Sequence, residues 1–270
     1  MRSVKIGFIL LASIAFLLVL IFIGYGALGF SPKESIRSLG EFILKESYNI
    51  YDRKWWAASP EAVNAALWDY RGLDTVYETT VFYLAVIGCV TVFRLSGKHE
   101  TKGKREEKGY ALTVVVRTVS KIIFAAIILI AAVIALHGHV TPGGGFQAGS
   151  AFAIAPLMLI AAFSRELVEK LGLKVELSHA LKSVALLTIA LIALVPLAYS
   201  GFILQNQFKP WSTFPGFPVG STAALISGTI FPLNVAEFLN VAMGFLTIFL
   251  IISLPEHVFK KEIGESQHAT

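Results

Sequence analysis

Long apolar blocks separated by short polar stretches dominate the pattern of this chain. A helix needs about 20 apolar residues to cross the hydrocarbon core of a bilayer. Six blocks meet this length, at residues 6–28, 75–96, 113–136, 146–163, 178–200 and 230–253. The pattern predicts an all-α, polytopic integral membrane protein with about six transmembrane helices.

The polar stretch 31–73 lies between the first two blocks. Within it, segment 36–50 repeats apolar residues at helical spacing, which predicts an amphipathic helix lying in the membrane interface. Trp55, Trp56 and Trp68 follow. A location at the headgroup level suits them, and an ordered loop packed on a partner explains them nearly as well.

Composition agrees with lipid as the solvent. The chain is 55% hydrophobic and 15% charged, with a mean hydropathy of +0.69, whereas soluble domains carry more charge. The single cysteine, Cys89, excludes a disulfide framework and a thiolate-ligated zinc or iron–sulfur site. We expect no cofactor, no metal site and no nucleic-acid partner.

The amino terminus resembles a signal peptide, because Arg2 and Lys5 precede the first apolar block. That block is longer than a typical signal core, and no clear A-x-A site follows it. We interpret it as a retained first helix.

Basic residues predict the orientation in the cell membrane. Loop 97–110 is rich in Lys and Arg, which keeps a short loop in the cytoplasm. Counting helices from it places both termini in the cytoplasm and the loops 138–145 and 201–221 outside. Stretch 31–73 is the exception, since its six basic residues face outward, balanced by six acids.

The same basic loop is the predicted domain boundary. It separates a two-helix unit, 1–97, from a four-helix unit, 110–255, which a cytoplasmic tail, 256–270, follows. The two units differ in helix number and loop chemistry, so we find no convincing internal repeat.

Ionisable residues inside apolar blocks are candidates for an ion pathway, because they are costly in lipid. Asp74 and Glu78 share one face of the second helix. Acids near a helix amino end also favour its dipole, which explains Asp74 equally well. Arg117 and Lys121 enter the third helix from the opposite side, so we expect no direct ion pair between the two sets.

Two further candidates lie in the fifth and sixth helices. Lys182 shares a face with His179, and extension of its stem to the surface is the simpler explanation for it. Glu237 lies between two asparagines after Pro232, and we expect this proline to interrupt the apolar run 219–253, which is too long for a simple span. A broken helix beside a carboxylate suits a hydrated site; Glu237 lies at the outer interface instead if the span begins at Pro232.

The most specific string is HGHVTPGGGFQ, from His137 to Gln147, between the third and fourth helices. Its glycines permit a sharp, close-packed return. The motif residues are Thr141, Pro142, Gly143, Gly144, Gly145 and Phe146. His137 and His139 are a weak metal pair; a hydrogen-bonded structural role or a proton relay fits them better. The string is not a P-loop, because the Gly-Lys-Ser/Thr ending is missing.

HGHVTPGGGFQAG resembles the signature of the MrpB (MnhB) subunit of multisubunit cation/proton antiporters. PLNVAEFLNVAMGF, 232–245, is similar to the last helix of that family. The first unit resembles a small MbhE-like subunit or the carboxy-terminal piece of MrpA. Its R-G/A-x-D-T-x-x-E core corresponds to Arg71, Gly72, Asp74, Thr75 and Glu78.

The resemblance implies a membrane subunit of a sodium/proton antiporter module. Such subunits occur in Mrp antiporters and in membrane-bound hydrogenase, sulfane reductase and formate hydrogenlyase complexes. An archaeal respiratory complex is favoured over a stand-alone antiporter. The expected partners are other membrane subunits, lipids, sodium ions and protons.

Alternatives remain for the function. A structural subunit would seal the membrane arm and leave conduction to its neighbours. Intrinsic catalysis is not expected, since no nucleophile–base pair, metal cage or dinucleotide fingerprint is present. A stand-alone carrier is disfavoured, because six helices without a repeat fit carrier architectures poorly.

Overall fold

The structure, a computed structural model, describes residues 2–24, 35–93, 113–216 and 227–254. The chain divides into two units, 1–42 and 43–270, and the division falls within helix α2 (Ser38–Glu46). The first unit contains α1 (Arg2–Gly24), whose apolar stretch Leu10–Phe22 has exposed side chains. In α2, Glu41 in the first turn and Lys45 in the last turn both suit the helix dipole.

Five long helices of the second unit are long and apolar enough to cross a membrane. They are α4 (Gly72–Val92), α5 (Val114–His137), α6 (Gly145–Ala162), α8 (Val175–Leu194), which continues as the 3-10 helix η2 (Val195–Tyr199), and α10 (Ile230–Ile252). Short elements accompany them. The helix α3 (Ala62–Ala65) and the π-helix η1 (Ala66–Tyr70) precede α4, and α7 (Arg165–Lys170) lies between α6 and α8. The predicted all-α, polytopic fold is confirmed.

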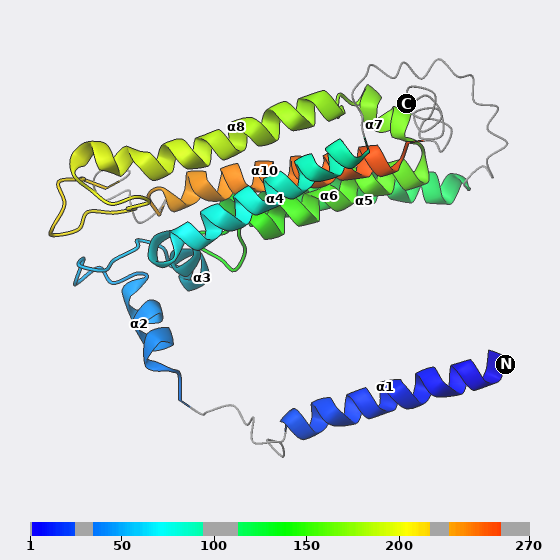
Figure 1. Cartoon of the computed structure of the whole chain (residues 1–270), viewed down its shortest axis with the longest axis horizontal. Coiled ribbons are helices and arrows are strands. Elements are labelled where there is room, and N and C mark those ends of the chain that lie inside the picture. Colours follow the sequence, from blue (N-terminus) through cyan, green and yellow to red (C-terminus); the bar gives the residue numbers. More distant parts are fainter. Residues whose placement is uncertain (1, 25–34, 94–112, 217–226, 255–270) are drawn as a thin grey trace, which may run out of the picture. The chain divides into compact units, whose positions relative to one another are not determined.

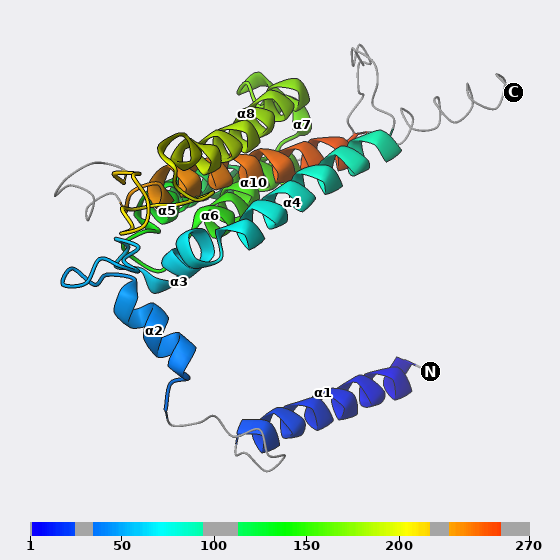
Figure 2. The ribbon, with the colours of Figure 1, turned by 60° about the vertical axis from the view of Figure 1, so that its left-hand side comes forward.

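Helix α10 is the central helix of the bundle. It packs against α4, α5, α6 and α8, and it lies among them in both views (Figures 1 and 2). Within the apolar window of α10, 61% of the residues are buried, against 17% for α4 and for α5. The outer helices therefore present most of their apolar side chains to lipid or to other proteins.

Glycines let the neighbouring helices approach α10 closely. A Cβ atom added at Gly149 of α6 would lie 2.6 Å from the Val241 Cβ atom, and one added at Gly244 of α10 would overlap the Phe82 ring of α4. Small residues at such crossings are typical of helix pairs in membranes, where close packing replaces the hydrophobic effect as the driving force.

Several helix ends meet at one end of the bundle. Helices α4, α6 and α10 begin, and α5 and α8 end, at the same end of the bundle as the loop 138–144 (Figure 1). We call this the glycine-loop end. Trp68 is buried there in an apolar cluster with Ile189, Leu204 and Leu233, so this part of the tryptophan-rich stretch packs inside the chain itself.

Pro232 lies at the start of the last helix rather than at a break within it, so the span begins near the proline, as the alternative prediction stated. Helix α10 begins at Ile230 and continues without interruption to Ile252. The proline lies in the first turn, where its missing N–H has no intrahelical partner to lose. The helix therefore starts at the proline region, and Glu237 is two turns inside it.

Two sequence predictions concern residues outside the described part of the chain. They are the basic loop 97–110 and the tail 256–270, both of which lie wholly there. The boundary between the two-helix and four-helix units, the membrane orientation and the interfacial position of α2 stay predictions.

Candidate functional site

Three polar side chains of α10 are buried in the centre of the bundle. Asn234, Glu237 and Asn240 follow one another at three-residue spacing and are 0%, 4% and 0% exposed. Glu237 is the eighth residue of the helix, so it lies about 10 Å from the helix start at about 1.5 Å per residue. A carboxylate at that depth needs compensating partners.

The glycine loop supplies one such partner to Glu237. The backbone N–H of Phe146 donates a hydrogen bond to the Glu237 carboxylate. A Cβ atom added at Gly145 would lie 2.6 Å from the Glu237 Cβ atom and would overlap the carbonyl oxygen of Asn234. The amino end of α6, which carries a positive partial charge, thus rests directly on this carboxylate because residue 145 has no side chain.

Two neighbouring amides have atoms without a hydrogen-bond partner among the described residues. Asn240 Nδ2 donates to the Thr79 carbonyl of α4 over 3.3 Å, while its Oδ1 atom is buried without a partner. Asn234 accepts from Trp68 Nε1 over 2.9 Å, while its Nδ2 atom is likewise unpaired. Buried polar atoms are nearly always satisfied by protein or by water. Water would complete either amide, whereas a hard cation would complete only the Asn240 oxygen.

The two acidic residues of α4 have different environments. Asp74 forms an exposed ion pair with Arg71, at 2.5 Å between the guanidinium and the carboxylate. Such a pair contributes little to stability. Glu78 is also exposed in this chain, but it lies near enough to Glu237 for repulsion between the two carboxylates. The structure therefore associates Glu78, and not Asp74, with the Glu237 site.

The predicted basic pair lies at the other end of the bundle. Arg117 and Lys121 are exposed in the first turns of α5, and both lie over the Phe163 ring, at 5.6 and 5.9 Å from its centroid. They are therefore not brought together with Glu237.

The two histidines of the motif differ in exposure. His137 is exposed at the end of α5. His139 is buried, its ring packs edge-on against Phe231, and its carbonyl oxygen accepts hydrogen bonds from the Ser59 hydroxyl (2.9 Å) and the Glu61 N–H (3.3 Å). Within the described residues, no group of three or more His, Cys, Asp or Glu side chains could hold a metal ion.

Lys182 does not extend to the surface of this chain, contrary to the simpler expectation. Its side chain is 0% exposed, and its Nζ atom lies 4.8 Å from the centroid of the Tyr83 ring of α4. That Nζ atom has no hydrogen-bond partner among the described residues. The interaction with the ring face compensates part of the cost of burying this group.

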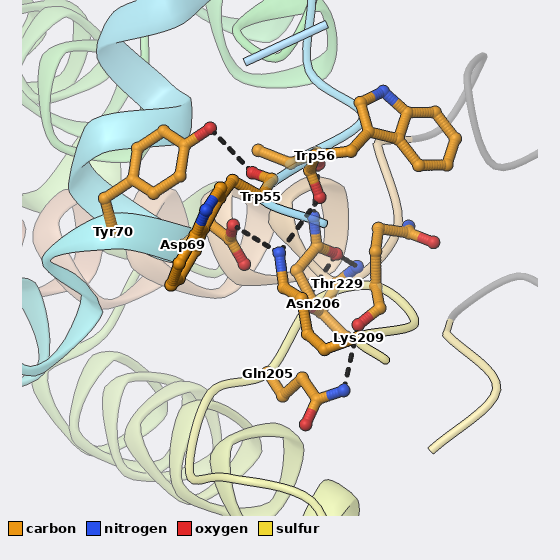
Figure 3. Close-up of polar contacts among 10 residues, drawn as sticks. Trp55, Trp56, Asp69, Tyr70, Gln205, Asn206, Lys209 and Thr229 are labelled. Carbon is orange, nitrogen blue, oxygen red and sulfur yellow. Dashed lines mark hydrogen bonds and ion pairs between the residues drawn. The ribbon is translucent and has the colours of Figure 1, made fainter. Parts of the chain in front are cut away.

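A second polar cluster closes the glycine-loop end, as Figure 3 shows. Lys209 and Asp69 are 9% and 4% exposed, and the Lys209 Nζ atom lies 3.5 Å from the Asp69 carboxylate. The same Nζ atom donates to the Trp56 carbonyl over 3.1 Å. Burial raises the pKa of Asp69, and the charge of Lys209 with a hydrogen bond from the Asn206 N–H offsets only part of that effect.

Asn206 joins three separate segments in this cluster. Its Nδ2 atom donates to the Ala57 carbonyl over 2.5 Å, and its Oδ1 atom accepts from the Thr229 N–H over 2.6 Å (Figure 3). Burial, followed by the negative charge of Asp69, also raises the pKa of Tyr70. The cluster ties the loops around 57 and 206 to the residue that precedes α10.

Sequence reasoning did not identify the residues that hold this region together. They are Asn64, Trp68, Asp69, Asn206 and Lys209. The one available signal was a lysine in an otherwise uncharged loop, because a buried lysine requires a partner. Nothing in the sequence identified that partner as Asp69, 140 residues away.

Comparison with known proteins identifies relatives of most of the chain. Residues 115–247 match the domain related to the MnhB subunit of Na+/H+ antiporter. The chain is 30% identical over 142 residues to the putative antiporter subunit mnhB2 of Staphylococcus haemolyticus, which is 52% of this chain and 94% of that protein. An uncharacterised protein of Methanocaldococcus jannaschii is 27% identical over 221 residues, 77% of this chain and 82% of that one.

Two solved structures are similar, and both are chains of multisubunit membrane complexes. One belongs to the membrane-bound sulfane sulfur reductase, an archaeal respiratory membrane complex, with a TM-score of 0.56, 25% identity and coverage of 90% of this chain and 96% of that one. The other belongs to the Mrp complex of Dietzia, with a TM-score of 0.54 and 16% identity over 90% of this chain and 26% of that one. The second likeness concerns the fold alone.

Proposed function

Since the chain belongs to the MnhB family of Na+/H+ antiporter subunits, we propose that it contributes directly to sodium and proton translocation in a respiratory complex of the membrane. The near-complete coverage of a chain of an archaeal respiratory complex supports this setting. In this proposal, the redox chemistry of such a respiratory complex takes place in its other chains, because this chain has a single cysteine and no thiolate cluster for an iron–sulfur site.

The buried Glu237 carries the proposal. A carboxylate in the centre of a membrane bundle costs several kcal/mol unless water, a cation or a hydrogen-bonded partner reaches it. Glu237 has one backbone hydrogen bond, a second carboxylate nearby, and amide neighbours with unsatisfied atoms. Carboxylate and amide oxygens are the ligands of hard cations, and a carboxyl group also transfers protons.

The other candidates take secondary places in this proposal. Glu78 extends the site toward the surface of α4, and the buried Lys182 is a second station for protons between α4 and α8. The remaining polar residues adjust the electrostatic potential at the two ends of the proposed ion path. They are Asp74, Arg117, Lys121, His137 and His139.

Replacing Glu237 by glutamine should remove most sodium-dependent proton exchange, because the amide can neither ionise nor release a proton. Glu78→Gln should weaken the exchange less. Inverted membrane vesicles that contain the complex would report exchange as a sodium-induced change of internal pH, and blue-native gels would report assembly. Glu166→Gln is the matched control, since Glu166 is exposed on α7 outside the bundle. Normal exchange in both Glu237→Gln and Glu78→Gln would place the ion path elsewhere.

A structural role is the second candidate, and the exposure of the outer helices favours it. Only 17% of the apolar windows of α4 and α5 is buried within the chain, which suits helices that pack against other subunits. This function predicts that the same glutamine variants reduce the yield of assembled complex and leave the exchange per complex unchanged.

A further inference from the structure

The short helical segment 62–70 lies beside the Glu237 site although it is distant in sequence. It comprises α3 and the π-helix η1 and lies outside residues 115–247, the part that matches the antiporter-subunit domain. Two of its side chains, Asn64 and Trp68, are one turn apart and 0% and 1% exposed. Asn64 donates hydrogen bonds to the glycine loop that leads into α6, and Trp68 donates one to α10, which carries Glu237.

We propose that Asn64 and Trp68 are positioning residues that set the geometry of the Glu237 site. The inference rests on the proposed function of Glu237. It adds that the antiporter-subunit domain does not form this site alone: segment 62–70 holds both the loop and the helix that meet at the carboxylate.

Asn64 holds the glycine loop. Its Nδ2 atom donates to the carbonyl oxygens of Gly138 and Gly143, the latter over 3.3 Å. These two carbonyls lie at the beginning of the loop and just before its last glycines. The hydrogen bonds to both carbonyls fix the position at which the loop enters α6. The first N–H groups of α6 include that of Phe146, which donates to Glu237.

Trp68 holds the helix. Its Nε1 atom donates to Asn234 Oδ1 over 2.9 Å, and both groups are fully buried. Asn234 precedes Glu237 by three residues, so the two side chains occupy the same region of α10. The bond also determines which amide atom of Asn234 stays unpaired near the site, namely Nδ2.

The local backbone explains how one short segment provides both contacts. The Glu61 carboxylate accepts from the Asn64 N–H over 2.5 Å and caps α3. The chain then widens into the π-helix, a form that often occurs at functional sites. The Thr75 hydroxyl donates to the Leu67 carbonyl over 2.7 Å. This bond ties the π-helix to α4 and gives Trp68 a fixed direction.

The sharpest test removes a single N–H group. Trp68→Phe keeps an aromatic ring but loses the bond to Asn234. Trp56→Phe is the matched control, because Trp56 is also buried and its Nε1 atom has no hydrogen-bond partner in the part of the chain that the structure describes. In vesicles with the assembled complex, Trp68→Phe should raise the sodium concentration for half-maximal exchange about two- to tenfold, the effect of one net hydrogen bond. Trp56→Phe should leave it unchanged.

Further variants separate positioning from stability. Asn234→Ala removes the same bond from the other side, and the Trp68→Phe, Asn234→Ala double variant should be no worse than either single variant. Asn64→Ala should give a similar rise in the half-maximal sodium concentration through the loop. A purely structural role would lower the amount of complex and leave that concentration unchanged.

Glu237→Gln in the same vesicles distinguishes the two proposals. Loss of exchange in Glu237→Gln together with a normal half-maximal concentration in Trp68→Phe and Asn234→Ala overturns the positioning proposal alone. Normal exchange in Glu237→Gln removes the premise of the positioning proposal, and normal exchange in Glu78→Gln as well overturns the proposed function. If Trp68→Phe does not assemble, the half-maximal concentration of Asn234→Ala decides the outcome.

Discussion

Lys209→Met should destabilise the protein by about 3–5 kcal/mol at neutral pH, because it leaves Asp69 buried without its cation. Asp69 is 4% exposed and lies 3.5 Å from Lys209. Methionine fills a similar volume, so lost packing contributes little. Thermal unfolding of the purified protein in mild detergent measures the change, and Lys170→Met on the exposed side of α7 is the control.

The stability lost in Lys209→Met should be smaller at acid pH than at neutral pH. Burial already raises the pKa of Asp69 above that of the unfolded chain, so its ionisation costs stability as the pH rises from the ordinary aspartate range through the raised pKa. The positive charge of Lys209 lowers the pKa of Asp69, so the Lys209→Met change raises that pKa further. The pH range over which ionisation of Asp69 destabilises the fold then extends to higher pH. The variant should therefore recover stability as the pH falls and Asp69 becomes protonated. Lys209→Met combined with Asp69→Asn should lose this pH dependence; equal losses at pH 5 and pH 7.5 in both variants would contradict the account.

Gly145→Ala should be the second most damaging change, at about 1–3 kcal/mol for overpacking a rigid contact. The added Cβ atom would lie 2.6 Å from the Glu237 Cβ atom and would overlap the Asn234 carbonyl oxygen. Backbone atoms cannot move aside as a flexible side chain would, so α6 must shift away from α10. The shift would also pull the Phe146 N–H from the Glu237 carboxylate, so exchange should fall even in complexes that assemble.

A glycine in an open position serves as the control that tests whether overpacking causes the destabilisation expected for Gly145→Ala. No atom of the described residues lies within 4 Å of a Cβ atom added at Gly88 of α4. Gly88→Ala should be neutral or slightly stabilising, because alanine is the better helix former. If Gly145→Ala assembles as well as Gly88→Ala and has the same thermal midpoint, the contact between α6 and α10 is not tight.

The sequence predicted the helices well but not their places in the bundle. The apolar runs around α4, α5, α6, α8 and α10 end within a few residues of the observed helices, since apolar length alone determines which segments cross lipid. Hydropathy could not identify the central helix. Helix α5 has the higher mean hydropathy, 2.8 against 2.2 for α10, and yet is far more exposed, because lipid and a bundle interior are both apolar solvents.

The candidate site was predictable only in part for a similar reason. Glu237 could be identified because a charge in an apolar run is conspicuous. Its partners could not, since one is the backbone N–H of Phe146, which every residue but proline carries. Residue type suited Trp68 to the membrane interface or to a loop packed on a partner, and only the folded chain shows that its Nε1 atom donates to an asparagine 166 residues away.

The central position of α10 has a consequence for biogenesis. This helix is the last described one to leave the ribosome, and it carries the buried Asn234, Glu237 and Asn240, whose side chains are costly to release into lipid alone. Until it arrives, the helices that will surround it expose the Thr79 carbonyl of α4 and the backbone at Gly145 of α6 toward the place that α10 will occupy. Membrane insertion of this protein should therefore pause in an open, incomplete ring of helices, and the final segment enters by pairing with that ring rather than by partitioning into the bilayer independently.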